Sequence, residues 1–214
     1  MDKKLKVFIV DDHDMFRQGV KVLLGKSQQT EIIGEASNGK EFLDVIRDIE
    51  PDVILMDISM PVLDGIEATR QALQIKPHLK ILTLSMFGDE EYYYKMIQSG
   101  VRGFIMKSAG IDELEHSIKQ VAEGSAYFSE ELLEIVKTNI NTDSVQSDQQ
   151  TLSKVEIELL KALTSSLSDA DIAREMGVTT DSYEKLRKDL LKKTGSVNTA
   201  GLIMYAIKNR IVGI

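Results

Sequence analysis

The sequence predicts a doubly wound α/β domain with a five-stranded parallel sheet, followed by a small all-helical domain. Three observations lead to this prediction. Over residues 5–124, short apolar runs rich in β-formers alternate with longer helical patterns, which is typical of βαβ units around a parallel sheet. A polar stretch, NTDSVQSDQQT, then interrupts the pattern. Beyond it the chain has helical periodicity only.

The first domain is expected to contain five strands and five helices in strict alternation. The runs of β-formers place the strands at residues 6–10, 30–36, 52–58, 80–86 and 103–107. Apolar residues at three- and four-residue spacing place the helices at residues 14–26, 38–49, 65–76, 89–100 and 110–124. This alternation predicts a flavodoxin-like sheet with helices on both faces.

The chain divides into a first domain at residues 1–124, a linker at 125–151 and a helical domain at 152–214. A helix is possible at the start of the linker, over residues 129–140. Helices in the second domain are expected at residues 152–163, 168–177, 179–193 and 198–210, with Ser168 and Asn198 as N-caps. The middle pair, joined at Gly177, has the layout of a helix-turn-helix, whose second helix enters the DNA major groove.

Composition restricts the class of protein. The chain has 214 residues and no cysteine, so disulfides and thiolate metal sites are excluded. No apolar run is long enough for a membrane span and no signal peptide is apparent, so we expect a cytoplasmic protein without membrane contact. The net charge is −8, yet residues 152–214 carry ten Lys and Arg against eight Asp and Glu. This local excess permits DNA binding by the second domain without requiring it.

Polar residues stand where the strands of the first domain end. Asp11 and Asp12 follow the first strand, Asp57 lies at the end of the third, Ser85 of the fourth and Lys107 of the fifth. The carboxyl ends of parallel strands form the ligand site of a doubly wound sheet. Clustered carboxylates are ligands for Mg²⁺, and a carboxylate can also accept a phosphoryl group. The alternative for each single Asp is that it starts a turn or caps a helix.

The motifs VDDH, MDISMPVLDG, LSMF and GFIMK, in this order at strand ends, resemble the receiver domain of two-component response regulators over residues 5–124. The resemblance implies that Asp57 accepts the phosphoryl group and that Lys107 and Ser85 bind it. It also implies that Mg²⁺ is held by Asp11, Asp12, Asp57 and the backbone carbonyl of Ser59. Ser85 and Phe104 would be the switch residues, with Phe104 in place of the common tyrosine. Gly65 is expected to adopt a positive φ after the third strand.

The second domain resembles the LuxR-type output domain of the NarL/FixJ subfamily over residues 152–212. This resemblance makes residues 179–193 the recognition helix. The expected DNA contacts are Thr180, Ser182, Tyr183, Lys185, Arg187, Lys188 and Lys192. Glu184, Leu186 and Asp189 depart from the family pattern, because acidic or apolar side chains stand where a cation or a hydrogen-bond donor is usual. An output domain that has lost DNA affinity and acts through protein contacts therefore stays an alternative.

Together these expectations describe a response regulator that is phosphorylated on Asp57 by a sensor histidine kinase and regulates transcription by binding promoter DNA. We expect a phosphoacceptor signalling protein rather than an enzyme, with slow self-dephosphorylation only, because no substrate cap or second catalytic acid is visible. The phosphorylated form is expected to be a homodimer. The helix at residues 198–210 is the candidate for the dimer contact, although its apolar face could equally close the core of the small domain.

Overall fold

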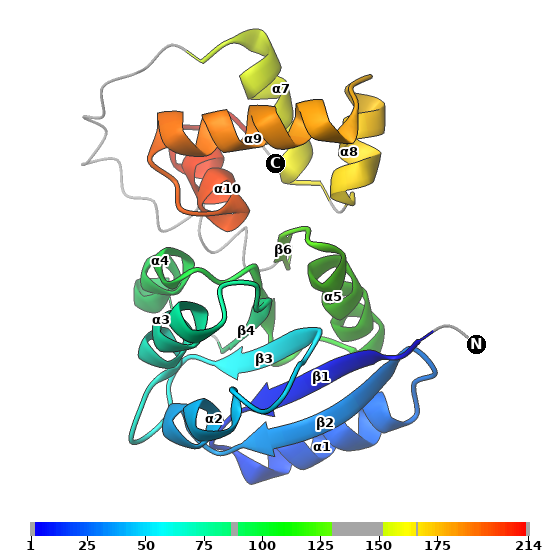
Figure 1. Cartoon of the computed structure of the whole chain (residues 1–214), viewed down its shortest axis with the longest axis vertical. Coiled ribbons are helices and arrows are strands. Elements are labelled where there is room, and N and C mark those ends of the chain that lie inside the picture. The colour runs from blue at the N-terminus through cyan, green and yellow to red at the C-terminus, as the bar shows by residue number, and fades with distance from the viewer. Residues whose placement is uncertain (1–2, 87–89, 130–151, 166, 213–214) are drawn as a thin grey trace.

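The protein consists of an α/β domain and a helical domain stacked along the long axis of the molecule (Figure 1). The structure is a computed structural model, and it describes residues 3–86, 90–129, 152–165 and 167–212. The possible helix at residues 129–140 and most of the expected linker lie outside the described residues. In the part of the chain that is described, no helix combines the length and apolar character needed to cross a bilayer.

A parallel sheet forms the centre of the α/β domain. Its strands are β1 (Leu5–Val10), β2 (Thr30–Ala36), β3 (Val53–Asp57), β4 (Ile81–Ser85), β5 (Gly103–Met106) and β6 (Tyr127–Phe128). They are arranged in the order β2-β1-β3-β4-β5-β6, with every pair parallel. The prediction of five strands is therefore short by one. The additional strand has only two residues and occupies the beginning of the expected linker.

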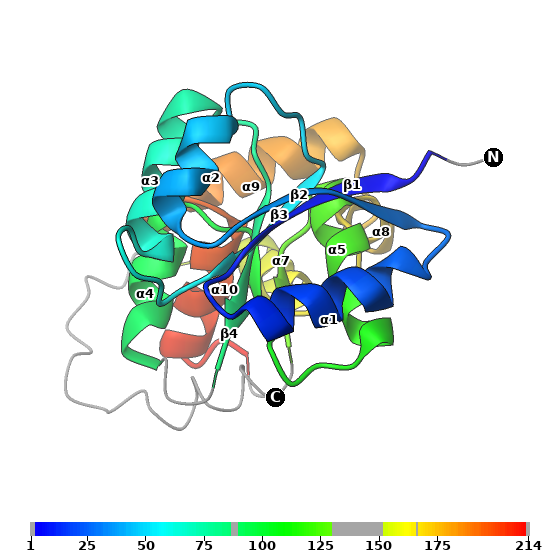
Figure 2. The same ribbon diagram turned by 90° about the horizontal axis from the view of Figure 1, so that it is seen from below.

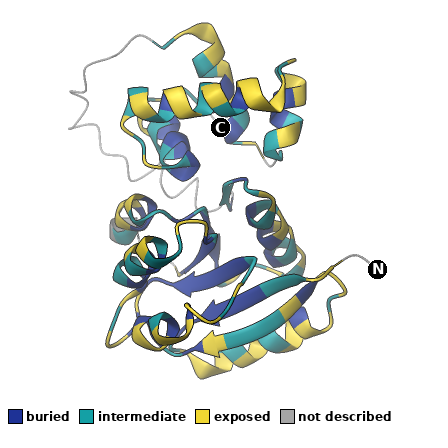
Figure 3. Ribbon diagram, viewed as in Figure 1, coloured by how far each residue is buried: buried dark blue, intermediate teal, exposed yellow. Residues whose placement is uncertain are grey.

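Two layers of helices cover the sheet (Figure 2). The helices are α1 (Asp14–Gly25), α2 (Gly39–Val45), α3 (Gly65–Ile75), α4 (Glu90–Ser99) and α5 (Ile111–Glu123). Alternate residues of each strand point to opposite faces, so Val7 and Ile9 pack with α1 and α5, whereas Phe8 and Val10 pack with α2, α3 and α4. The central strands are buried on both faces, which explains why their sequences are almost continuously apolar, whereas β2 at the edge is partly exposed (Figure 3).

Gly65 starts α3 directly beside the carboxyl end of β3. The expected positive φ is wrong, because Gly65 is not among the glycines with positive φ. Glycine is required here by close approach instead: a Cβ atom on Gly65 would lie 1.9 Å from the carbonyl oxygen of Asp57. This contact brings the α3 N-terminus against the strand end that carries Asp57.

The helical domain has the four helices that the sequence predicts, α7 (Lys154–Leu163), α8 (Asp169–Glu175), α9 (Thr180–Thr194) and α10 (Thr199–Lys208). The predicted N-caps are confirmed, since Ser168 accepts a hydrogen bond from Asp171 N and Asn198 accepts one from Gly201 N. Gly177, at φ 67°, makes the turn between α8 and α9. The helix-turn-helix layout is thus present.

The two domains share a continuous apolar core. The cluster that fills the α2–α3–α4 face of the sheet extends into the interior of the helical domain. The helices α4 and α10 are in contact, and both views show them close together (Figures 1 and 2). The helical domain is therefore docked on the side of the α/β domain that carries α4.

Candidate functional site

Lys107 bridges two carboxylates at the carboxyl edge of the sheet. Its Nζ atom lies 2.8 Å from Asp11 Oδ2 and 3.0 Å from Asp57 Oδ1. Asp57 ends the fully buried strand β3, and its Oδ1 atom also accepts a hydrogen bond from Ile58 N at 2.9 Å. The positions of Asp11, Asp57 and Lys107 at strand ends predicted this cluster, and the structure brings the three side chains together.

Burial raises the pKa of Asp57, whereas neighbouring carboxylates raise that of Lys107. Asp57 is 4% exposed, and burial raises its pKa from 3.8 to about 6, with the charge of Lys107 opposing the shift and that of Asp11 adding to it. Burial alone would lower the pKa of Lys107, but the adjacent carboxylates of Asp11 and Asp57 raise it above the ordinary value. At neutral pH Asp57 is therefore mostly ionised, and Lys107 is protonated.

The neighbouring acidic side chains fit a hard cation. Ligand atoms of Asp11, Asp12, His13 and Asp57 lie within 4.8 Å of one another. Within the described part of the chain, Asp11 Oδ2 and Asp12 Oδ1 receive no hydrogen bond of normal geometry, although charged nitrogens are near. Buried carboxylate oxygens that lack a donor are suited to a metal such as Mg²⁺. Ser59 is exposed two residues beyond Asp57, beside a cleft that Asp64 and Tyr92 also line.

Ser85 and Phe104 are both fully buried on adjacent strands. Ser85 Oγ bonds to the hydroxyl of Tyr93 at 3.1 Å and lies 3.3 Å from the carbonyl oxygen of Met86. Tyr93, on α4, is a functional candidate that the sequence reasoning missed. The run of three tyrosines does not show by itself which ring is buried. Met96 and Ile97 follow Tyr93 by three and four residues and are buried, so the apolar spacing of the helix selects Tyr93.

The outward face of α9 presents most of the expected DNA-binding residues. The residues exposed to solvent along this helix are Thr180, Ser182, Lys185, Lys188 and Lys192. Asp181 and Asp189 are exposed as well, so the face carries three cations and two carboxylates. Glu184 is occupied within the helix, because its Oε1 atom accepts a hydrogen bond from Arg187 at 2.6 Å.

Tyr183 and Arg187 do not lie on that face, which corrects the expectation that they contact DNA. Tyr183 is 1% exposed, and its hydroxyl donates to Asp169 Oδ1 at 2.8 Å. Arg187 donates to Asp169 Oδ2 at 2.8 Å and to Thr199 Oγ1 at 3.2 Å. Asp169 is thus the acceptor of a half-buried network that holds α8 and α9 together. The sequence contains a signal for this network: Arg187 follows Tyr183 by four residues, so both side chains lie on the same side of the helix.

This network lies next to the α/β domain. Arg102, just before β5, is largely buried, and burial together with the charge of Arg187 lowers its pKa. Asp169 N donates to Ser125 Oγ at 3.2 Å. The Nδ2 atom of Asn198 donates to the carbonyl oxygens of Val101 at 2.9 Å and Ile97 at 3.3 Å. The domain contact therefore combines apolar packing with directional hydrogen bonds.

Known proteins match both halves of the chain. The family described as "Response regulator receiver domain" matches residues 7–119. The transcriptional regulatory protein MctR of Rhizobium johnstonii is 33% identical, over 98% of this chain and 96% of its own length. The crystal structure of the response regulator ChrA, from a heme-sensing two-component system, is 25% identical with a TM-score of 0.54, over 98% of this chain and 99% of that one.

A structure of two RcsB dimers bound to two parallel DNAs has the same fold, with 19% identity, a TM-score of 0.59 and coverage of 96% and 99% of the two chains. The similarity to MctR and to ChrA extends over the receiver and the helical domain alike. It confirms the resemblance that the sequence motifs carry to response regulators with a LuxR-type output domain. Because the receiver-domain family matches more than half of the chain, the chain belongs to the response regulator family.

Proposed function

We propose that Asp57 accepts a phosphoryl group and that this modification controls DNA binding by α9. The observation that carries the first part is the ammonium group of Lys107, held 3.0 Å from Asp57 and 2.8 Å from Asp11. It is placed to neutralise charge that develops on a transferred phosphoryl group.

The oxygen that attacks phosphorus is proposed to be Asp57 Oδ2. Oδ1 is already engaged by Lys107 and by Ile58 N, so Oδ2 is the oxygen with fewer assigned partners. In the transfer, a new bond forms between Asp57 and phosphorus while the bond from phosphorus to the imidazole nitrogen of a donor histidine breaks. The leaving imidazole takes up a proton. Asp57 must be ionised to attack, which its pKa of about 6 permits at neutral pH.

Asp11, Asp12 and Asp57, with the Ser59 carbonyl, are proposed to hold Mg²⁺, which would balance the charge of the phosphoryl oxygens. Asp12→Ala is expected to weaken Mg²⁺ binding by roughly tenfold or more, because a carboxylate ligand and its charge are lost. A metal titration followed by NMR measures this change. Asp14→Ala, the same type of substitution at an exposed position of α1, should bind Mg²⁺ like the parent. Equal affinities of the parent and Asp12→Ala would contradict the metal role.

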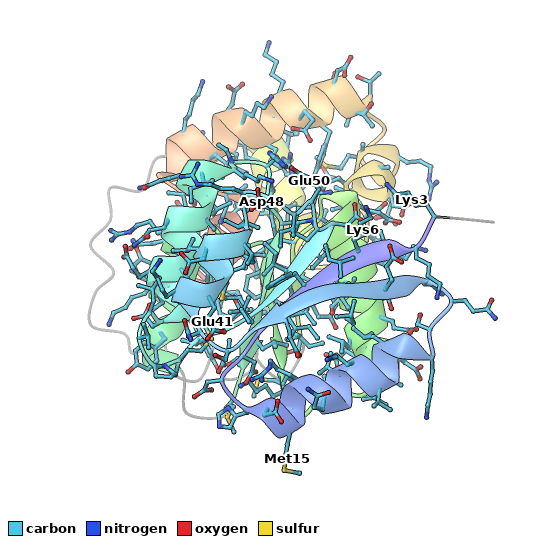
Figure 4. All side chains as sticks on the ribbon, turned by 60° about the horizontal axis from the view of Figure 1, so that its bottom comes forward. Lys3, Lys6, Met15, Glu41, Asp48 and Glu50 are labelled. Carbon is cyan, nitrogen blue, oxygen red and sulfur yellow. The ribbon has the colours of Figure 1, made fainter. Side chains whose placement is uncertain are left out.

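The proposed phosphoryl donor is a sensor histidine kinase. The N-terminal end of α1, next to Asp12 and His13, offers an apolar contact beside the pocket. Met15 is 90% exposed there, and Figure 4 shows it projecting away from the body of the protein.

Because both the kinase's phosphoryl group and promoter DNA are found in the cytoplasm, we propose that the protein works there.

The output is proposed to be sequence-specific binding of duplex DNA by the exposed face of α9. Lys185, Lys188 and Lys192 are the proposed phosphate contacts, and Thr180 and Ser182 lie at the helix start, where base edges are usually read. Selection from random and genomic duplexes with the Asp57-phosphorylated protein tests this proposal. A shared, two-fold symmetric site is the expected result. Failure to enrich any sequence, in a sample shown to carry phosphate, would favour an output domain that contacts protein instead.

Lys188→Ala is expected to weaken binding to all duplexes by a similar factor and to reduce the slope of log affinity against log salt by about one. The cause is the loss of one phosphate contact with its released counterion. Titrations at several salt concentrations measure the slope. Lys40→Ala removes the same charge from the exposed surface of α2 and should leave the slope unchanged. An unchanged slope in Lys188→Ala would remove this residue from the interface.

A phosphorylated homodimer is also proposed, because two recognition helices read two half-sites. The expected dimer helix, α10, has its apolar side against the core of its own domain and touches α4. A dimer through α10 therefore requires that this helix leave α4, which sedimentation of the full chain with and without phosphate tests.

A further inference from the structure

The hydroxyl groups of Ser85 and Tyr93 form a hydrogen bond beneath the proposed phosphorylation site. Ser85 Oγ donates to Tyr93 Oη at 3.1 Å, and both residues are buried, at 0% and 2% exposure. Ser85 also lies 3.3 Å from the Met86 carbonyl, but a serine hydroxyl has a single proton to donate. If Ser85 turns that proton to a phosphoryl oxygen, the bond to Tyr93 in its present form is lost.

Tyr93 stands in a row of aromatic rings. Its ring meets Phe104 edge to face at a centroid distance of 5.4 Å, and Phe104 lies 5.7 Å from Phe128 of β6. Phe104 carries no hydroxyl, so this buried aromatic cannot bond to Ser85. The phenol that reaches Ser85 belongs to α4, the helix that contacts α10 of the output domain.

The same helix carries the domain contact. Ile97 follows Tyr93 by four residues, and its carbonyl oxygen, with that of Val101, accepts the Nδ2 hydrogens of Asn198. The Ser85 bond and the bond from Asn198 to Ile97 therefore lie about one helical turn apart on α4, and Val101 follows two residues after that helix ends.

We propose that Tyr93 is a positioning residue that couples the state of Ser85 to α4 and thereby to the docked output domain. In the unmodified protein, the Ser85 bond holds Tyr93 and α4 in the docked arrangement. When Ser85 donates to the phosphoryl group instead, α4 loses this restraint. The inference rests on the proposed function, because it requires that Asp57 carry the phosphoryl group.

The test uses beryllofluoride, which mimics the phosphoryl group, with Mg²⁺ and the full chain. Tyr93→Phe keeps the ring and removes the hydroxyl, so only the unmodified state loses the bond. The beryllofluoride concentration for half-saturation, measured by fluorine NMR, should fall about fivefold, the value of one neutral hydrogen bond. Tyr94→Phe is the matched control, because it removes a hydroxyl from the next residue of α4, which is exposed.

The Ser85→Ala background provides the second measurement. There the bond is absent already, so Tyr93→Phe should have no further effect on half-saturation. The proposal would be overturned if Tyr93→Phe changed the half-saturation concentration equally in both backgrounds. It would also be overturned if Tyr93→Phe alone bound beryllofluoride no more tightly than the parent. Failure of the parent protein to take up beryllofluoride would instead contradict the proposed function, so the two failures are distinguishable.

Discussion

Asp57→Asn is expected to abolish phosphoryl uptake and, at the same time, to make the unmodified protein more stable at pH 8. The first effect follows from the loss of the nucleophilic oxygen charge. The second follows from burial, which raises the pKa of Asp57 from 3.8 to about 6. The folded protein holds the proton more tightly than the unfolded chain, so ionisation of Asp57 costs folding free energy.

The sign of the pH dependence follows directly. Asp57 contributes no penalty below about pH 4, where it is protonated in both states. The penalty grows as the pH rises from 3.8 to about 6 and is constant above that range. From a shift of this size, Asp57→Asn should gain roughly 2–3 kcal/mol in free energy of unfolding at pH 8 and little at pH 4.

Urea unfolding in metal-free buffer at the two pH values measures this difference, and mass spectrometry after incubation with a small phosphodonor measures uptake. Asp44→Asn, at an exposed position of α2, is the control and should show no comparable gain at pH 8. A stability gain in Asp57→Asn that is the same at both pH values would contradict the burial argument. Retained phosphate in this variant would contradict the assignment of the acceptor.

Asp169→Ala is expected to destabilise the helical domain by about 3 kcal/mol or more. Asp169 accepts hydrogen bonds from the buried Tyr183 hydroxyl and from Arg187, whose side chain is 14% exposed. Alanine would leave the arginine charge and the phenol without this acceptor, and removing one partner of such a pair costs more than the pair itself contributes. The loss should appear first as faster amide exchange in α8 and α9.

Asp169→Asn separates the charge from the hydrogen bond. Its amide oxygen can still accept from Tyr183, so we expect a loss of about 1 kcal/mol. Glu175→Ala, at an exposed position at the end of α8, should leave exchange in α9 unchanged. Hydrogen exchange followed by mass spectrometry on the full chain compares the three variants. If amide exchange in Asp169→Ala equalled that of the parent, the network would not stabilise the helical domain.

The sequence predicts the parallel sheet and its acidic edge because both depend on local patterns. Asp11, Asp57 and Lys107 each follow an apolar strand, and parallel strands bring their carboxyl ends to one edge. The short strand β6 escaped prediction because two residues carry no detectable period. Tyr183 was placed on the DNA face through family resemblance, whereas its ring packs in the apolar core of the helical domain and its hydroxyl bonds to Asp169. Contacts between the domains, such as those of Asn198, join residues about a hundred positions apart and have no local pattern.

The side chain of Asn198 limits how freely domains can be exchanged between related proteins. Its oxygen caps α10, while its nitrogen donates to the receiver. Serine, threonine or aspartate would also cap a helix, but none of them offers the amide nitrogen. An output domain grafted onto this receiver with one of those caps would fold and yet lack the docking bonds. Whether an output domain can dock on this receiver thus depends partly on the residue at one helix cap, Asn198.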